Sequence, residues 1–116
     1  MNAEGSSKMA IIRGTTPTLT FHVKNEQLDL TEIAEIWITF KTKMGSPPKE
    51  KTFGMDNITI NAEEHTIELY LEQEDTLYFA GVQILLQIRA RFNSDLAYAS
   101  NIMDIDLGQI LKEGVI

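Results

Sequence analysis

The sequence of 116 residues has no cysteine, only three prolines and a single tryptophan. Without cysteine the chain has no disulfide, no thiolate metal ligand and no thiol nucleophile. The longest apolar stretch, residues 82–88, is far shorter than the ~20 residues of a membrane-spanning helix. Residues 1–8 lack the apolar core of a signal peptide, so we expect synthesis in a cytoplasm. We leave those residues out of the fold as a disordered arm or a vector-derived remnant.

Basic residues are also few, with 10 Lys and Arg against 17 Asp and Glu and a net charge of -7. Such a charge repels nucleic acids and anionic membranes, so we expect neither as a partner. The densest basic group is interrupted by residues 46–48 and Glu50, and we interpret it as the solvated loop of a hairpin. Its members are Lys41, Lys43, Lys49 and Lys51.

Apolar and polar residues alternate along most of the chain, and this period of two is typical of half-buried strands. Turn residues separate the alternating segments. The sequence therefore predicts an all-β fold, an immunoglobulin-like antiparallel β-sandwich of about seven strands over residues 9–108. The predicted strands are 18–23, 35–41, 51–53, 57–61, 66–71, 82–92 and roughly 99–107. On the last two, the expected inward residues are Val82, Ile84, Leu86, Ile88, Ala90, Phe92, Met103, Ile105 and Leu107.

Three other segments do not alternate. Residues 30–34 are predicted to form a turn in which Thr31 caps a single helical turn. Residues 72–79 are predicted to form a short α- or 3₁₀-helical turn, because acidic residues at its start suit the helix dipole. Residues 109–116 form an apolar C-terminal tail that should need cover. This tail, or an exposed edge strand, could drive homo-oligomerisation.

The polar residues form no arrangement typical of an active site. Asp104 and Asp106 share one face of a strand, but no glycine-punctuated calcium loop surrounds them, so we interpret them as a solvated face. His22 and His65 are isolated, and no G-x-S-x-G motif is present. We therefore predict no enzyme activity, no metal and no cofactor.

The outward positions of the predicted strands are more informative. If the inward assignments hold, Trp37, Tyr70, Leu85 and Ile102 point away from the core. An exposed cluster of this kind indicates a protein interface, in which Trp and Tyr are typical anchors. Two alternatives remain: Trp37 could stack on sugar rings in a carbohydrate-binding module, or the four residues could be scattered or covered by the tail or by residues 72–79.

Short motifs occur in a fixed order along the chain. An R-G-T-T opening at residues 13–16 precedes the first alternating strand, and D-L-T follows at 29–31. A strand ending in Phe40-Lys41, the segment L-E-Q-E-D-T at 71–76 and a glycine-led long strand from Gly81 complete the order. Over residues 11–108 this order resembles small β-sandwich domains of tailed phages and prophages. The nearest are the N-terminal domain family of the phage baseplate upper protein and small uncharacterised prophage proteins of Gram-positive bacteria.

The resemblance implies a virion structural protein without catalysis, made in the bacterial host cytoplasm, whose sandwich docks onto other tail or baseplate proteins. The multi-domain members continue into a receptor-binding or trimerising region. We therefore expect an accessory or adaptor role for this chain rather than a direct adhesin role. Within the motifs, we expect Gly14 to permit a turn. The side chains of Asp29, Thr31, Asp75 and Thr76 should fix local turns by forming hydrogen bonds with nearby backbone groups.

Overall fold

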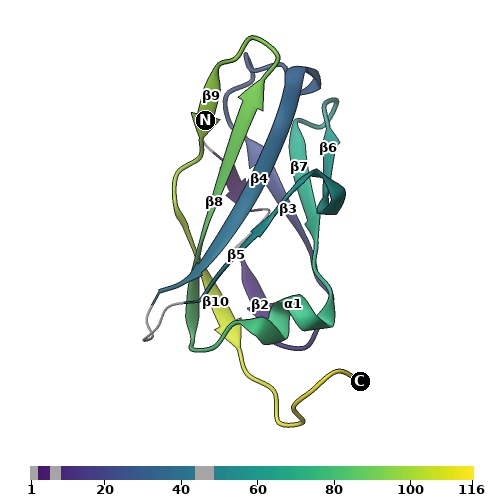
Figure 1. The fold of residues 1–116 in the computed structure, drawn as a ribbon, viewed down its shortest axis with the longest axis vertical. Coiled ribbons are helices and arrows are strands. Elements are labelled where there is room, and N and C mark those ends of the chain that lie inside the picture. The colour runs from purple at the N-terminus through teal and green to yellow at the C-terminus, as the bar shows by residue number, and fades with distance from the viewer. Residues whose placement is uncertain (1–2, 6–8, 44–48) are drawn as a thin grey trace.

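The computed structural model describes residues 3–5, 9–43 and 49–116, which fold into two facing β-sheets (Figure 1). The first sheet has four strands in the order β1 (Ala3–Gly5), β3 (Thr18–Val23), β7 (Thr66–Tyr70) and β6 (Ile58–Asn61). The path of the second, six-stranded sheet is β2 (Ala10–Ile12), β10 (Met103–Gly108), β8 (Gln83–Phe92), β4 (Ile33–Thr42) and β5 (Glu50–Phe53). Its sixth strand, β9 (Ala97–Ala99), pairs with β8.

This strand order is that of an immunoglobulin sandwich, so the predicted fold class is confirmed. Strands β1, β3, β7 and β6 occupy the places of strands A, B, E and D, and β4, β8 and β10 those of C, F and G. The predicted details need two corrections. The described residues form ten strands rather than about seven. The sandwich is also not wholly antiparallel, because β2 pairs with β10 in parallel.

The core lies between the sheets and consists of the residues that alternation places inward. Phe40 is central to it, with its ring 5.6 Å from that of Phe53 and 5.7 Å from that of Phe79. Two predicted inward residues differ from expectation. Val82 is 70% exposed because β8 begins one residue later, and Met103 is only half-buried against the core.

The strand predicted over 99–107 is too long at its start, because β10 begins at Met103 and Ala99 is the last residue of β9, with Ser100–Ile102 between the two strands. The buried Ser100 causes this break, since its Oγ accepts a hydrogen bond from the Ile88 N–H at 2.9 Å and donates to the Asn101 carbonyl at 2.8 Å. The neighbouring Asn101 side chain accepts from the N–H of Ala3, which is buried. Residues 3–5, which we had left out of the fold, thus belong to the four-stranded sheet as β1. Residues 1–2 and 6–8 lie outside the described residues.

Helix α1 (Gln73–Tyr78) confirms the helical turn predicted for 72–79 and lies across one end of the sandwich (Figure 1). Glu72 and Asp75 form its capping box. The 3₁₀ helix η1 (Leu30–Glu32) confirms the other predicted turn, but its cap is Asp29 rather than Thr31. Asp29 Oδ1 accepts from the Thr31 N–H at 3.0 Å and from its hydroxyl at 2.6 Å. A second 3₁₀ helix, η2 (Met55–Asn57), precedes β6.

The R-G-T-T and E-D-T motifs meet at α1, and we call helix α1 with residues 13–16 the α1 end. The Arg13 side chain donates from Nε to the Phe79 carbonyl at 3.0 Å and from Nη2 to the Leu77 carbonyl at 3.3 Å. The Gly14 N–H donates to Thr76 Oγ1 at 2.9 Å, from a backbone with φ +77°. The Thr76 hydroxyl donates to the Thr15 carbonyl at 3.0 Å. The turn roles predicted for Gly14, Asp75 and Thr76 are therefore confirmed.

The C-terminal tail extends beyond the α1 end (Figure 1). Glu113 pairs with Arg13 at 2.8 Å, and the Gln73 side chain exchanges two hydrogen bonds with the backbone of Ile116. Ile110 is half-buried, but the other apolar residues of the tail remain exposed, namely Leu111, Val115 and Ile116.

Candidate functional site

The outward side of the six-stranded sheet carries three of the four residues predicted to form an interface. Trp37 lies on β4, Leu85 on β8, and Ile102 directly before β10. Trp37 is 41% exposed and Ile102 63%, whereas Leu85 is half-buried. We call this surface the six-stranded face. It is defined by the outward residues of β4, β5, β8 and β10 together with Ile102.

Tyr70 does not belong to this surface. It lies on β7 of the four-stranded sheet, where it is 48% exposed and stands opposite Thr18 of β3. The structure therefore brings Trp37, Leu85 and Ile102 to one side of the sandwich and leaves Tyr70 on the other sheet. Trp37 and Ile102 are exposed, so neither the C-terminal tail nor α1 covers them. The alternative that the tail or residues 72–79 cover these side chains is therefore wrong for Trp37 and Ile102.

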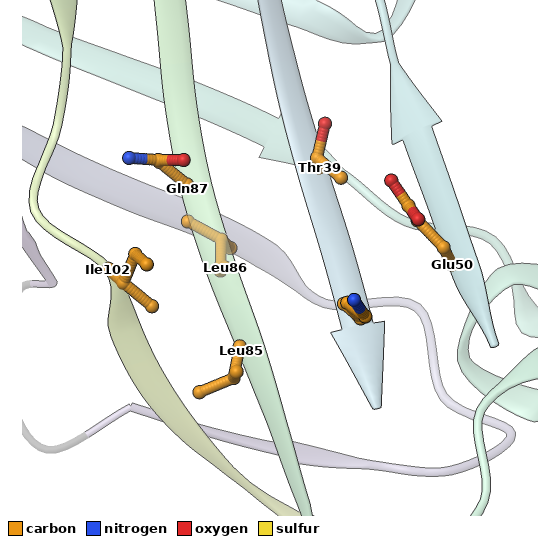
Figure 2. A pocket seen from close by; sticks show the side chains of 7 residues that line it. Thr39, Glu50, Leu85, Leu86, Gln87 and Ile102 are labelled. Carbon is orange, nitrogen blue, oxygen red and sulfur yellow. The ribbon is translucent and has the colours of Figure 1, made fainter. Parts of the chain in front are cut away.

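Leu85 and Ile102 border a shallow hollow of about 210 Å³ (Figure 2). Figure 2 shows Leu85, Leu86 and Gln87 along β8, with Ile102 on one side and Thr39 of β4 on the other. The Gln87 amide donates to the Ser100 carbonyl at 2.9 Å. Lys41 and Glu50 also line the hollow, so its rim is charged and its floor is apolar.

A second hollow, of about 340 Å³, lies beside Trp37. Trp37 stands directly opposite Arg89 in the register of β4 and β8. Arg91 is held by Glu35 at 3.2 Å and by Asp95 at 3.5 Å. The exposed Arg89 side chain, by contrast, has no hydrogen bond or ion pair with any residue in the described ranges. A guanidinium with no partner among the described residues therefore stands beside the only tryptophan of the sequence.

The other end of the six-stranded face is acidic on β10. Asp104 pairs with Lys43 across an N–O distance of 3.3 Å, and Asp106 accepts from the Gln83 amide at 3.3 Å. Within 3–5, 9–43 and 49–116, no three His, Cys, Asp or Glu residues lie close enough to hold a metal ion. The two histidines lie elsewhere. His22 is exposed on β3, and His65, in the turn before β7, contacts the Asn25 carbonyl through Nε2 at 2.9 Å.

The basic group predicted to be a solvated loop is partly structural. Lys51 Nζ lies 2.6 Å from Asp75 Oδ1, and Lys49 Nζ donates to the Tyr78 carbonyl at 3.2 Å. These contacts fix the edge strand β5 to α1. The tip of the loop, residues 44–48, lies outside the described residues.

No protein-family model and no curated protein sequence matches the chain. No helix in the described part of the chain is long and apolar enough to cross a membrane. The description of the candidate site therefore rests on the structure of this chain alone. It combines an exposed aromatic ring, two shallow hollows and charges of both signs on one sheet surface.

Proposed function

We propose that this protein is a non-enzymatic structural component of a phage or prophage particle, an accessory tail or baseplate protein that acts through protein–protein contacts. The observation that carries the proposal is that the exposed Trp37 and Ile102 and the half-buried Leu85 lie on the same six-stranded face. Exposed apolar residues that cluster on one surface typically mark a binding site for another protein. Tryptophan and arginine are the residue types enriched at the energetic centres of such sites, and Trp37 and Arg89 are neighbours here.

The phage context of the proposal is supported by the order of motifs that resembles baseplate sandwich domains. Two of these motifs, at residues 13–16 and 74–76, are joined by the hydrogen bonds of Thr76. In this chain the two motifs together close one end of the sandwich. Residues 13–16 and 74–76 are thus engaged in the fold, whereas the exposed Trp37 and Ile102 are available to a partner.

A carbohydrate-binding module is the weaker candidate. An exposed tryptophan favours it, but a sugar platform usually presents further aromatic rings. The hollow beside Trp37 is lined by Glu35, Arg89, Ala90, Arg91 and Ala97 and by no second aromatic residue that the structure describes. A glycan array probed with and without EDTA tests this candidate, and specific binding in either condition would favour it over a protein partner.

The proposed function is tested by co-expressing the chain with the products of the genes adjacent to its own and measuring complex formation. We expect a stable complex with a tail or baseplate protein. The substitutions Trp37→Ser and Ile102→Ser should each weaken it about tenfold or more, because they remove apolar anchors from the centre of the face. Tyr70→Ser, a matched change of an exposed aromatic residue on the other sheet, should leave it unchanged.

The absence of any complex with adjacent gene products would contradict the proposal. A complex that is lost with Tyr70→Ser but retained with the two other variants would contradict the assignment of the six-stranded face. Circular dichroism of each variant shows that the sandwich is intact, which we expect because all three side chains are exposed.

A further inference from the structure

We propose that the six-stranded face also binds a second copy of the same chain, forming a two-fold symmetric dimer. The two-fold axis lies parallel to the face, between the two copies. It runs perpendicular to the strands and passes over the Thr39–Gln87 pair. This inference rests on the proposed function in one respect, namely that the six-stranded face is an interface. It goes further by naming one occupant, and it follows from the strand register and from the distribution of charge.

The register of β4 and β8 places different groups at equal distances from the Thr39–Gln87 pair. Two residues toward one end, Trp37 stands opposite Arg89. Two residues toward the other end, Lys41 stands opposite Leu85. A two-fold axis across the strands exchanges these positions. It therefore places Trp37 of one copy over the Lys41–Leu85 pair of the other, where the 210 Å³ hollow lies (Figure 2).

The same rotation brings opposite charges together along β8 and β10. Arg89 of one copy comes over Leu85 of the second copy, and Asp104 is the sheet neighbour of that Leu85. The Arg89 guanidinium, which has no partner within residues 3–5, 9–43 and 49–116, thus comes beside the Asp104 carboxylate, which also pairs with Lys43 of its own copy. Two residues further out, Arg91 comes over Gln83 of the second copy, whose sheet neighbour is Asp106. Along β4, Glu35 of one copy comes over Lys43 of the second copy, so opposite charges meet there as well.

Ile102 occupies the centre of this arrangement. It precedes Met103, which pairs with Leu86, so it is level with Gln87 and therefore lies at the axis. Ile102 of one copy accordingly meets Ile102 of the other. The charges beside Ile102 change sign across the axis, and this gives the face the self-complementarity that a two-fold interface requires.

The size of the face limits how strong the dimer should be. β4 and β8 have ten residues each, β10 has six and β5 has four. With a rise of about 3.3 Å per residue and about 4.8 Å between strands, the face covers roughly 480 Å² in projection. Stable interfaces bury about 800 Å² on each partner. We therefore expect a reversible dimer whose population depends on protein concentration.

Sedimentation equilibrium of the purified chain over a wide concentration range tests the proposal. We expect a monomer–dimer equilibrium for the wild type and for Tyr70→Ser. Ile102→Lys should raise the dissociation constant more than about tenfold, because two like charges then meet at the axis. Dimer formation should also weaken as salt increases, since charge pairs support it.

A charge exchange gives a sharper test. Arg89→Asp and Asp104→Arg should each be monomeric alone, because every Arg89–Asp104 contact becomes a contact between like charges. An equimolar mixture of the two variants should form a heterodimer, since each contact then joins an aspartate to an arginine. A structural defect in either variant would not be repaired by mixing.

A wild-type chain that stays monomeric at all concentrations would overturn the dimer. A dimer that persists in Ile102→Lys and Arg89→Asp would also overturn it, because self-association would then use another surface. These results are separable from the proposed function. A monomer that still binds an adjacent gene product through Trp37 retains the proposed function, whereas a dimer that binds none of them refutes only the tail or baseplate role.

Discussion

The α1 end and the six-stranded face both carry charged and polar side chains, yet these side chains are used differently. At the α1 end, Arg13, Asp75 and Thr76 are each bonded to another part of the fold, and Asp75 and Thr76 are buried. On the six-stranded face, Trp37 and Ile102 are exposed and Arg89 has no partner among the described residues. The motif residues of the α1 end therefore stabilise the fold, whereas Trp37 and Ile102 on the six-stranded face remain exposed to solvent.

The largest effect that tests this comparison should come from Thr76→Val at the α1 end. The change removes the acceptor of the Gly14 N–H and the donor to the Thr15 carbonyl. Leaving partly buried backbone groups unpaired should lower the free energy of unfolding by about 1–3 kcal/mol, measured by urea denaturation. Thr76→Ser, which keeps the hydroxyl, is the control. If Trp37→Ser destabilises the chain as much as Thr76→Val, the distinction between the two regions is wrong.

A smaller effect should come from the Lys51–Asp75 ion pair, which joins β5 to the α1 end. Asp75 is buried and Lys51 partly exposed, so the pair is only partly screened by water. A double-mutant cycle with Lys51→Met and Asp75→Asn should give a coupling energy of about 1 kcal/mol. The corresponding cycle for Lys43 and Asp104, an exposed pair on the six-stranded face, should give less. Equal coupling energies would mean that the two regions do not differ in this respect.

The smallest effect concerns Asp29, which caps η1 outside both regions. The hydroxyl and N–H of Thr31 hold the pKa of the Asp29 carboxyl below its ordinary value of 3.8. Because the folded pKa is lowered, the stabilisation is fully present above the unfolded pKa of 3.8 and is lost as the pH falls from that value through the folded pKa. An NMR titration should show a midpoint below 3.8 in the wild type. A midpoint at the ordinary value, or no change on substitution of Thr31→Ala, would contradict this assignment.

Much of the fold was predictable because alternation reports directly which side of a strand is buried. It placed the inward residues of β8 after Val82 in the core correctly, as it did Ile105 and Leu107 of β10. The short strands β1, β2 and β9 were missed, since three residues are too few to show a period. The break at Ser100 was missed because it depends on a hydrogen bond to Ile88, which is distant in the sequence.

The candidate site was predictable only in part, for a physical reason. Alternation shows that Trp37 and Tyr70 point outward, but it does not show from which of the two sheets. That depends on strand pairing, which separates β4 from β7. The outward position of Arg89 also follows from alternation, whereas its lack of a partner depends on the side chains around it. The pairing and register of the strands, rather than the residue types, therefore determine which side chains form the six-stranded face.

The parallel pairing of β2 with β10 has a mechanical consequence. These strands are the first and last of the six-stranded sheet along the chain, and Asp106, Leu107 and Gly108 are aligned with Ala10, Ile11 and Ile12. Tension applied at residues 9 and 109 would pull the two strands in opposite directions along their length. Their hydrogen bonds would then be loaded in shear, all at once, instead of being unzipped one after another. The sandwich is thus built to resist extension between these two points.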